Sequence, residues 1–574
     1  MLERSGELIR GRQRPTGSDS PSDRVFPWEV AAVLVFSLVC LLPYYRLPPA
    51  DADEGLITAG AERILRGQIP YRDFFSELGP ATFYLQALLF KVMGVNATTV
   101  RLTAWLLGGA ITVLVFLLAR KLMPGFRAFL AASIIPLYVC PLDYRVDHHW
   151  WGNFFLLLLM LWILRSFPRP SAGVRAGGRA ALFLGGVLAA LTLLSMQTKG
   201  FWSVAMTGAF LMLQPWLGER RNWRDGLHQG GRQTAWFLAG VGACLISVAS
   251  YFYCHGAARA WIEDNFFFLL ANYWTYGVDV PQASALRTLL HLGHLALTQW
   301  SVHFNLYFIN TVFFLLLAPA AAFGGTAWQL FNSRRSVNSE GRILLFFLLE
   351  GVGAFLSEYH AHDEYHLISA APLMLILLVY QWDTLAARGG GFGLLAKGAA
   401  LMALAVMLVG SARKANAALQ VSSPVETRRG VVYARPSSAG DLRKVIEAIQ
   451  QRVPRGDETF VYPYVAELYF YTATRNPTRF EALLPEFHSA AQIEEAIARL
   501  MDARPRYVFS FEKIQRWTVR PHFPDDPPDA VLPHPVRKAL ATPGSGYHLE
   551  EVFASGYSTG QGQWAEVEVW AADQ

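Results

Sequence analysis

The sequence predicts an all-α membrane domain of about eleven transmembrane helices that is followed by a small α/β domain. Long apolar runs recur between residues 27 and 411, with short basic loops between them. Hydrophobic residues make up 53% of the 574 residues and charged residues only 16%, whereas soluble domains carry about 25% charge. From about residue 413 onward the chain becomes more polar, which indicates a separate domain.

A spanning helix needs about 20 mostly apolar residues. The segment before the first apolar run, residues 1–24, is polar and basic. We expect a disordered cytoplasmic tail there, because a cleavable signal peptide would place its apolar stretch earlier. The multi-span domain then covers residues 25–412. Its expected spans are 27–45, 99–119, 127–142, 149–165, 180–197, 200–217, 234–253, 302–322, 343–357, 365–382 and 393–411.

Residues 81–94 are apolar but too short to cross a bilayer comfortably, so we expect an interfacial helix in the first outer loop. The basic loops then fall on the side of the N-terminus, as the positive-inside tendency requires. This parity places the N-terminus in the cytoplasm and residues 413–574 on the periplasmic or extracellular side. The basic loops contain Arg120, Lys121 and Arg127, then Arg165, Arg169, Arg175 and Arg179, then Arg220, Arg221, Arg224 and Arg232, then Arg334, Arg335 and Arg342.

The net charge of +6 does not indicate nucleic-acid binding, because the basic residues are spread over these loops rather than gathered in one patch. The cysteines form no CxxC pair, so neither a disulfide framework nor a thiolate zinc site is indicated. They are Cys40, Cys140, Cys244 and Cys254, all in or beside apolar segments.

The polar C-terminal region alternates helical and extended patterns. Residues 441–453 and 490–503 have amphipathic helical spacing. Residues 458–464 and 506–511 have the composition of strands, and the stretch 546–571 suggests two more. A small α/β domain over residues 413–574 follows from this alternation.

The first outer loop, residues 46–80, opens with three carboxylates, Asp51, Asp53 and Glu54. Carboxylates at this density repel one another, so a cation, a metal or a proton-transfer task would explain them. The alternative is purely structural, because acidic side chains suit the first turn of a helix that begins near Gly55.

The loop and its surroundings resemble the GT-C glycosyltransferases. The sequence DADEGLITAGAERILRGQIPYRDFFSELGP is followed by the interfacial segment and by TTVRLTAWLLGGAITVLVFLLARKL. The order is similar to that of protein O-mannosyltransferases and aminoarabinose transferases: an Asp-Glu pair after the first span, a GxxPYxDF-like turn, an interfacial helix and an Arg at the head of the second span. The Arg is Arg101 here.

Three later stretches extend the resemblance over most of residues 25–412. LDYRVDHHWWGNFFLLLLMLW places Asp147 where the family often has an acidic residue, and LSMQTKGF places Lys199 in a corresponding turn. HDEYHLISAAPLMLIL, with Asp363 and His366, is similar to the family's PDxYHLLPALP segment. One departure concerns the first loop, where members with EKPP use the Lys near the lipid phosphate. This chain reads SELGP, so that Glu77 keeps the acidic place and Leu78 replaces the Lys.

The resemblance implies transfer of a sugar from a polyprenyl-phosphate donor with inversion. An acceptor hydroxyl needs a base, and a leaving phosphate benefits from nearby positive charge. By its place in the motif Asp53 is the expected base, and Glu54 would orient it or hold a cation. Lys199 is the expected phosphate contact, with snorkelling to the interface as its structural alternative. We expect neither Asp53 nor Lys199 to pack in the core.

Two outer loops are rich in residues that can bind zinc or manganese, although helix caps and water-facing loops explain such residues equally well. We therefore leave a divalent metal cofactor open. Glu350 lies within an expected span, where an ionisable group is usually paired or functional. The aromatic loop 254–299 could stack on sugars or anchor at the interface. The residues of the two loops are Asp143, Asp147, His148 and His149, and His360, His362, Asp363, Glu364 and His366.

The sequence thus predicts a multi-pass enzyme of the plasma (inner) membrane that glycosylates a glycan, lipid or protein acceptor on the outer face. Its expected substrate contacts are Lys199, Asp147, Glu77, Arg101, Asp363 and His366. A transporter or flippase of a lipid-linked glycan is the first alternative, but such proteins favour internal repeats and broken spans with midplane charges. A non-catalytic membrane scaffold is the second.

Overall fold

The structure is a computed structural model, and all statements about it refer to the residues that it describes. These are residues 25–47, 52–166, 178–216, 223–270, 311–332, 339–359, 364–387, 390–483, 488–511, 514–515, 535–559, 562–564 and 566–573. Asp51, His360, His362, Asp363 and most of the aromatic loop 254–299 lie outside this set, as does the side chain of Glu364.

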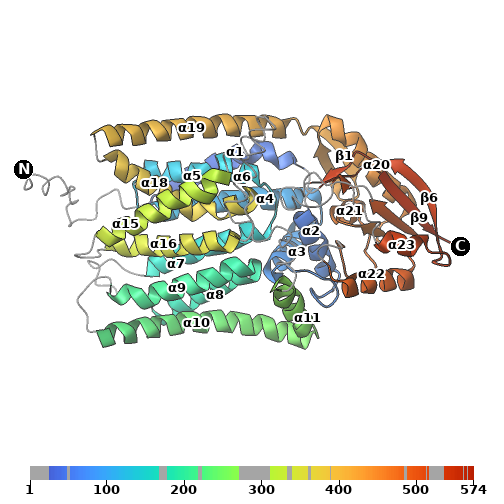
Figure 1. The fold of residues 1–574 in the computed structure, drawn as a ribbon, viewed down its shortest axis with the longest axis horizontal. Coiled ribbons are helices and arrows are strands. Elements are labelled where there is room, and N and C mark those ends of the chain that lie inside the picture. Colours follow the sequence, from blue (N-terminus) through green and yellow to red (C-terminus); the bar gives the residue numbers. More distant parts are fainter. Residues whose placement is uncertain are drawn as a thin grey trace, which may run out of the picture.

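Long helices lie side by side and form a bundle, and the C-terminal region covers one end of it (Figure 1). The shorter helices α2 (Ala52–Leu65), α3 (Pro80–Met93) and α11 (Ala258–Ile262) lie between the bundle and that region. The bundle contains α1 (Pro27–Leu41), η2 (Leu42–Arg46), α4 (Ala97–Ala119), α5 (Gly125–Ile134), η3 (Ile135–Val139), α6 (Cys140–Leu142), α7 (His148–Ser166), α8 (Arg179–Ser195), α9 (Gln197–Leu213), η5 (Gln214–Trp216), α10 (Trp223–Cys254), η7 (Phe313–Leu317), η8 (Ala320–Gly324), α15 (Gly325–Asn332), α16 (Ser339–Glu358), α17 (Glu364–Ser369), α18 (Ala371–Ala387) and α19 (Gly390–Leu419).

Each expected span overlaps one of these helical segments, and several of them have the length and hydropathy of a transmembrane helix. Within the described part of the chain, 6 helical segments meet both criteria, and two shorter ones, Arg179–Ser195 and Ala371–Ala387, are also strongly apolar. The structure therefore confirms a largely helical membrane protein, while the number of spans stays a prediction. The expected interfacial segment is α3, whose 14 residues are too few to cross a bilayer. The 6 segments are Pro27–Arg46, Ala97–Ala119, Gly125–Leu142, Trp223–Cys254, Phe313–Asn332 and Gly393–Leu419.

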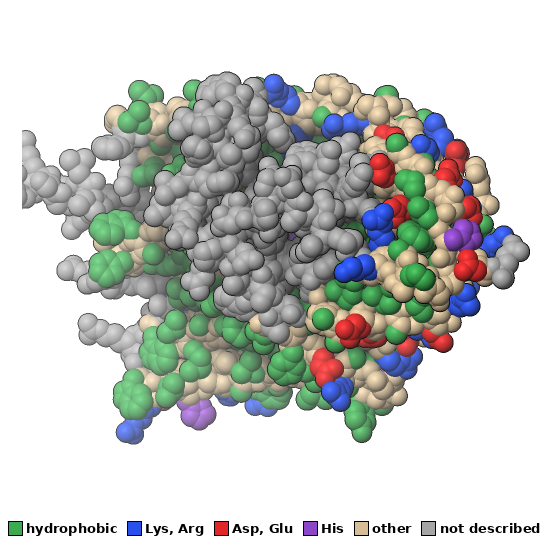
Figure 2. Space-filling model, turned by 45° about the vertical axis from the view of Figure 1, so that its right-hand side comes forward, with side chains coloured by type: hydrophobic (Ala, Val, Ile, Leu, Met, Phe, Trp, Pro, Cys, Tyr) green, Lys and Arg blue, Asp and Glu red, His purple; other side chains and the backbone are tan. Residues whose placement is uncertain are grey.

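The surface of the bundle has the character expected of a protein in lipid. In α19, only 6% of the apolar stretch is buried inside the protein. In Figure 2 apolar side chains cover the bundle at the lower left, whereas charged side chains of both signs gather over the C-terminal region at the right. The surface of the bundle thus suits lipid, and the surface of the C-terminal region suits water.

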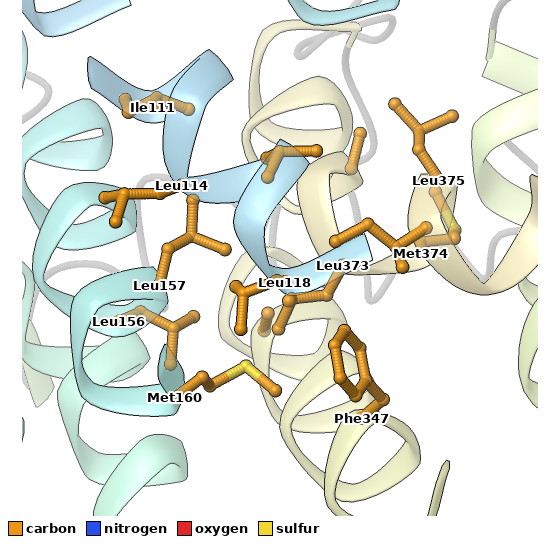
Figure 3. Close-up of a cluster of buried hydrophobic side chains, with 14 of the residues drawn as sticks. Ile111, Leu114, Leu118, Leu156, Leu157, Met160, Phe347, Leu373, Met374 and Leu375 are labelled. Atoms are coloured by element: carbon orange, nitrogen blue, oxygen red, sulfur yellow. The ribbon is translucent and has the colours of Figure 1, made fainter. Parts of the chain in front are cut away.

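The centre of the bundle is closely packed by aliphatic side chains from four helices. Figure 3 shows side chains of α4, α7, α16 and α18 that point toward one another. In a bilayer such packing, rather than exclusion of water, holds helices together. The buried set includes Ile111, Leu114, Leu118, Leu156, Leu157, Met160, Phe347, Leu373, Met374 and Leu375.

Helices α8 and α10 approach each other at two glycines. A Cβ at Gly186 would lie 1.9 Å from the carbonyl oxygen of Phe237, and one at Gly240 would lie 1.9 Å from that of Phe183. Small residues at a helix contact let two backbones come together, as in many membrane bundles. These two glycines therefore fix how closely α8 and α10 pack.

The C-terminal region contains the predicted helices and strands around a mixed four-stranded sheet of order β3-β4-β9-β6. β3 pairs with β4 in parallel, and the other two pairings are antiparallel. Helix α19 extends to Leu419, so the α/β part begins with the β1–β2 hairpin. The elements are β1 (Ser423–Thr427), β2 (Gly430–Ala434), α20 (Pro436–Arg452), β3 (Phe460–Tyr462), α21 (Glu467–Thr472), α22 (Ala490–Ala503), β4 (Tyr507–Phe511), β5 (Ile514–Gln515), α23 (Pro535–Ala541), β6 (Tyr547–Ala554), β7 (Ser558–Thr559), β8 (Gly562–Trp564) and β9 (Glu566–Ala572).

Candidate active site

Glu54, in the first turn of α2, is enclosed by protein on all sides. The guanidinium of Arg101 in α4 donates to its carboxylate, and the backbone N–H of Val146 donates to Glu54 Oε1 at 2.8 Å. Glu54 and Arg101 are both buried. These two residues therefore join α2, α4 and the segment before α7 from the inside.

Asp53 is the neighbouring carboxylate and has a more open environment. Its side chain is 22% exposed, and its Oδ2 lies 3.5 Å from Arg145 Nη1. The Nε of the same guanidinium lies 2.6 Å from Asp143 Oδ1 and 2.9 Å from Asp147 Oδ2. The structure thus gathers Asp53, Asp143 and Asp147 around Arg145. Arg145 was not singled out from the sequence, although its position two residues from each aspartate in DYRVD was a usable signal.

Asp147 precedes α7 and is fully buried. Burial by itself would raise the pKa of its carboxyl, but the adjacent Arg145 guanidinium and the imidazole of His148 outweigh it and hold the pKa well below its usual range. His148 Nδ1 lies 2.6 Å from Asp147 Oδ1, and the backbone N–H of His149 donates to the same oxygen at 3.0 Å. Asp147 is therefore ionised and oriented by three neighbours.

Histidines from the start of α7 and from α17 meet at this point. The ring centroids of His148 and His149 lie 4.1 Å apart, and the ring of His366 in α17 lies 5.2 Å from that of His149. His149 Nδ1 is 3.0 Å from Glu358 Oε1 at the end of α16. His366 is thus beside Asp147 and its neighbours, while Asp363 lies outside the described residues.

Lys199 does not lie at an exposed turn, and the expectation that it stays out of the core is wrong. It is 1% exposed, and its Nζ lies 2.9 Å from Glu358 Oε1 and 2.9 Å from Asn153 Oδ1. The reason is that α9 already begins at Gln197, so Lys199 faces α7 and the end of α16. Its charge is compensated by Glu358, which sequence reasoning missed because that carboxylate pairs with residues far away in the chain.

Glu77 belongs to a turn that is held from two sides. The side chains of Gln197 and Asn265 both donate to the carbonyl oxygen of Glu77, at 2.7 Å and 2.9 Å. Burial raises the pKa of the Glu77 carboxyl to about 7, and the negative charge of Asp53 adds to this while His148 opposes it. The Glu77 carboxyl is therefore close enough to Asp53 and His148 for their charges to affect its pKa. Leu78, which replaces the family's lysine, is buried.

No profile of a known protein family matches the chain, and no curated protein matches it. Solved structures do. The oligosaccharyltransferase of Archaeoglobus fulgidus, in its complex with Zn and sulfate, matches with a TM-score of 0.52 at 13% identity, over 93% of this chain and 73% of that chain. ArnT from Cupriavidus metallidurans bound to undecaprenyl phosphate matches with a TM-score of 0.51 at 14% identity, over 95% of this chain and 97% of that chain. Both are GT-C glycosyltransferases. The chain has the GT-C fold.

A likeness at this level of identity concerns the fold, so the chemistry of this GT-C chain has to be argued from its own residues. Its donor set can be compared with the preferences of metal ions. Ligand atoms of Asp147, His148 and His149 all lie within 4.8 Å of one another. A carboxylate with two imidazoles suits zinc or manganese, so the residue types fit a divalent ion at the start of α7.

Proposed function

We propose that this GT-C chain transfers a sugar from a polyprenyl-phosphate donor to an acceptor hydroxyl at the outer face of the membrane. The observation that carries the proposal is the meeting of Asp53, Arg145 and Asp147 at the end of the bundle that α2, α3 and the C-terminal region cover. Two solved structures of similar fold, one bound to undecaprenyl phosphate and the other in complex with a dolichol-phosphate, support a lipid-phosphate donor.

The reaction needs a base and a stabilised leaving group. Asp53 has an open side and lies in the first outer loop beside Arg145, so it takes the proton of the attacking hydroxyl. The acceptor oxygen bonds to the anomeric carbon as the bond from that carbon to the phosphate oxygen breaks. Inversion follows from this single displacement. The products are the glycosylated acceptor and the polyprenyl phosphate.

Positive charge near the leaving phosphate stabilises the transition state. His148 and His366 are titratable side chains close to Asp147 that would supply part of this charge. A divalent ion held by Asp147, His148 and His149 would add positive charge at the same place. Lys199 would act through Glu358 and His149 rather than as the main phosphate contact, because its Nζ is compensated inside the bundle. Asp363 and Glu77 remain proposed donor or acceptor contacts.

The membrane orientation is part of the same proposal. With a cytoplasmic N-terminus, the parity of the basic loops puts residues 413–574 outside a plasma membrane. Lipid-linked sugar donors and an external acceptor would then meet on the side of the C-terminal region. The structure supports this arrangement because α2 and the C-terminal region lie at the same end of the bundle (Figure 1).

The direct test is a transfer assay in liposomes with polyprenyl-phosphate sugars and the Asp53→Asn variant. We expect this variant to lose turnover by about 10²–10⁴-fold, because general-base catalysis is removed while shape is kept. The affinity for the donor lipid should stay within roughly threefold of the wild-type value, because the substitution leaves the donor contacts in place. Glu263→Gln is the matched control, since this carboxylate is 51% exposed and pairs with Arg259 four positions earlier in the chain.

Near-normal transfer by Asp53→Asn would remove it as the base. A wild-type protein that transfers no sugar but moves a lipid-linked glycan across the bilayer would replace the enzyme by a transporter.

A further inference from the structure

Arg145 is held in place by its own short segment. Asp143, Arg145 and Asp147 alternate along the non-helical stretch before α7, and the two aspartates contact the Arg145 Nε. The indole N–H of Trp150 donates to the carbonyl oxygen of Asp143 at 3.0 Å, and the N–H of Val146 donates to Glu54 at 2.8 Å. The backbone on both sides of Arg145 is therefore anchored.

From this anchored segment the guanidinium reaches across to α2. Its Nη1 lies 3.5 Å from Asp53 Oδ2, and its side chain is only 13% exposed. The ring of Tyr365 lies on another side, with its centroid 5.9 Å from the Arg145 Cζ. Two links therefore connect the start of α2 to the segment 143–147: Glu54 through a backbone N–H, and Asp53 through Arg145.

The balance of charge explains why this link matters. Three carboxylates surround one guanidinium, and without it their mutual repulsion would move them apart or favour their protonated forms. A guanidinium offers donors in a rigid planar fork, so it can restrain several carboxylates in a way that a flexible ammonium group cannot. Arg145 thus has the charge, the position and the rigidity to hold Asp53 and Asp147 as an oriented pair.

We propose that Arg145 is a positioning residue that keeps the Asp53 carboxylate aimed at the acceptor, an inference that rests on the proposed transfer reaction. Arg145 acts through Asp53 and not as a contact of the donor phosphate. Two consequences distinguish these roles. Loss of a positioning residue lowers kcat with little change in donor binding, whereas loss of a phosphate contact weakens donor binding. A positioning residue also loses its effect once the residue that it positions has been removed.

The experiment is a double-mutant cycle with Arg145→Ala, Asp53→Asn and the double variant, assayed for transfer and for binding of the polyprenyl-phosphate sugar. We expect Arg145→Ala to lower kcat by roughly 100-fold, the typical effect of a misplaced catalytic group, with donor affinity changed by less than about threefold. The double variant should be no more than about threefold slower than Asp53→Asn alone. Arg145→Lys keeps the charge without the fork and should fall between Arg145→Ala and the wild type.

Arg259→Ala is the matched control, because this arginine pairs with Glu263 on the surface and is 89% exposed. Its turnover should equal that of the wild type. Multiplicative losses in the double variant, or a weakened donor affinity with normal kcat, would overturn the positioning role. If the wild type transfers sugar in the same assay, such a result contradicts only the positioning role of Arg145. If the wild type transfers none, the proposed function itself is wrong.

The same double-mutant cycle can also be measured by protein stability, which does not require sugar transfer. Melting temperatures of the four proteins in detergent should shift non-additively if Arg145 and Asp53 interact, and additive shifts would contradict the pairing even in a protein that transfers no sugar. The same measurement shows whether Arg145→Ala still folds; if it does not, Arg145→Lys takes its place in the cycle.

Discussion

At the scale of single residues, the carboxylates of the first outer loop differ in how their charge is compensated. Glu54 is enclosed with Arg101, and breaking a buried pair of this kind costs about 3–5 kcal/mol. Asp53 shares Arg145 with two other aspartates and keeps an open side. Glu77 has Asp53 and His148 as its electrostatic neighbours. All three are carboxylates, and only their partners distinguish the enclosed anchor Glu54, the proposed base Asp53 and the proton-sensitive Glu77.

The raised pKa of Glu77 predicts a pH-dependent stability. Burial raises its pKa from 4.5 in a free side chain to about 7 in the folded protein. Between these values the folded state holds a proton that the unfolded state releases, so stability falls as the pH rises from 4.5 to 7. Glu77→Gln removes this loss, which amounts to on the order of 3 kcal/mol above the folded pKa.

The measurement is the melting temperature of wild type and Glu77→Gln at about pH 5 and about pH 8. The melting temperature of the variant should exceed that of the wild type only at the higher pH. Glu263→Gln, at an exposed pair, serves as control and should follow the wild type at both values. An equal difference between Glu77→Gln and the wild type at both pH values would show that the carboxyl is not desolvated.

At the scale of elements, the contact between α8 and α10 depends on Gly186 and Gly240. A methyl group at Gly240 would lie 1.9 Å from the Phe183 carbonyl oxygen, which is backbone and cannot turn aside. We expect Gly240→Ala to destabilise the bundle by about 1–3 kcal/mol, the usual cost of overpacking.

Gly242 supplies the matched control, because it belongs to the same helix and a Cβ there meets nothing within 4 Å. Gly242→Ala should leave stability unchanged or raise it slightly, since alanine is the better helix former. Melting temperature and the fraction of unaggregated protein in detergent report both variants. Equal effects of the two substitutions would mean that α8 and α10 are not in close contact.

At the scale of the whole molecule, the C-terminal region is joined to the first outer loop by buried polar contacts. Arg63 in α2 pairs with Glu481 at 2.5 Å, and both side chains are buried. The same guanidinium donates to the Thr478 carbonyl oxygen at 2.7 Å, and the N–H of Phe75 donates to that of Arg479 at 2.7 Å. Whatever side of the membrane holds Asp53 therefore also holds the C-terminal region.

This coupling makes the topology testable at two positions. In a Cys254→Ser background, which removes the exposed cysteine, a membrane-impermeant maleimide should label Ser437→Cys in intact cells but not His228→Cys. Both sites are exposed in the protein, so a difference in labelling reports the side of the membrane. Permeabilised cells, in which both variants should react, provide the control. Labelling of His228→Cys alone would reverse the orientation and move the proposed site to the cytoplasm.

The local pattern of apolar residues was sufficient to predict where the main helices and several strands lie. Hydropathy located the helices of the bundle, because a lipid environment imposes apolar side chains along a whole segment. The spacing of apolar residues located α20 and α22, because an amphipathic helix repeats with its own period, and strand-like composition located β4 and β6. The order of motifs along the chain also indicated Asp53, Glu54 and Asp147 as candidate site residues.

Partners across the fold could be decided only by the tertiary structure. Glu54 with Arg101, Asp53 with Arg145 and Lys199 with Glu358 are separated by 47, 92 and 159 positions in the chain. Charge compensation depends on distances of a few ångströms, which a linear pattern does not encode. The sequence therefore identified ionisable residues that the fold gathers at one end of the bundle. Packing of α2, α7, α9 and α16 decided which of them are enclosed anchors and which keep a side open for chemistry.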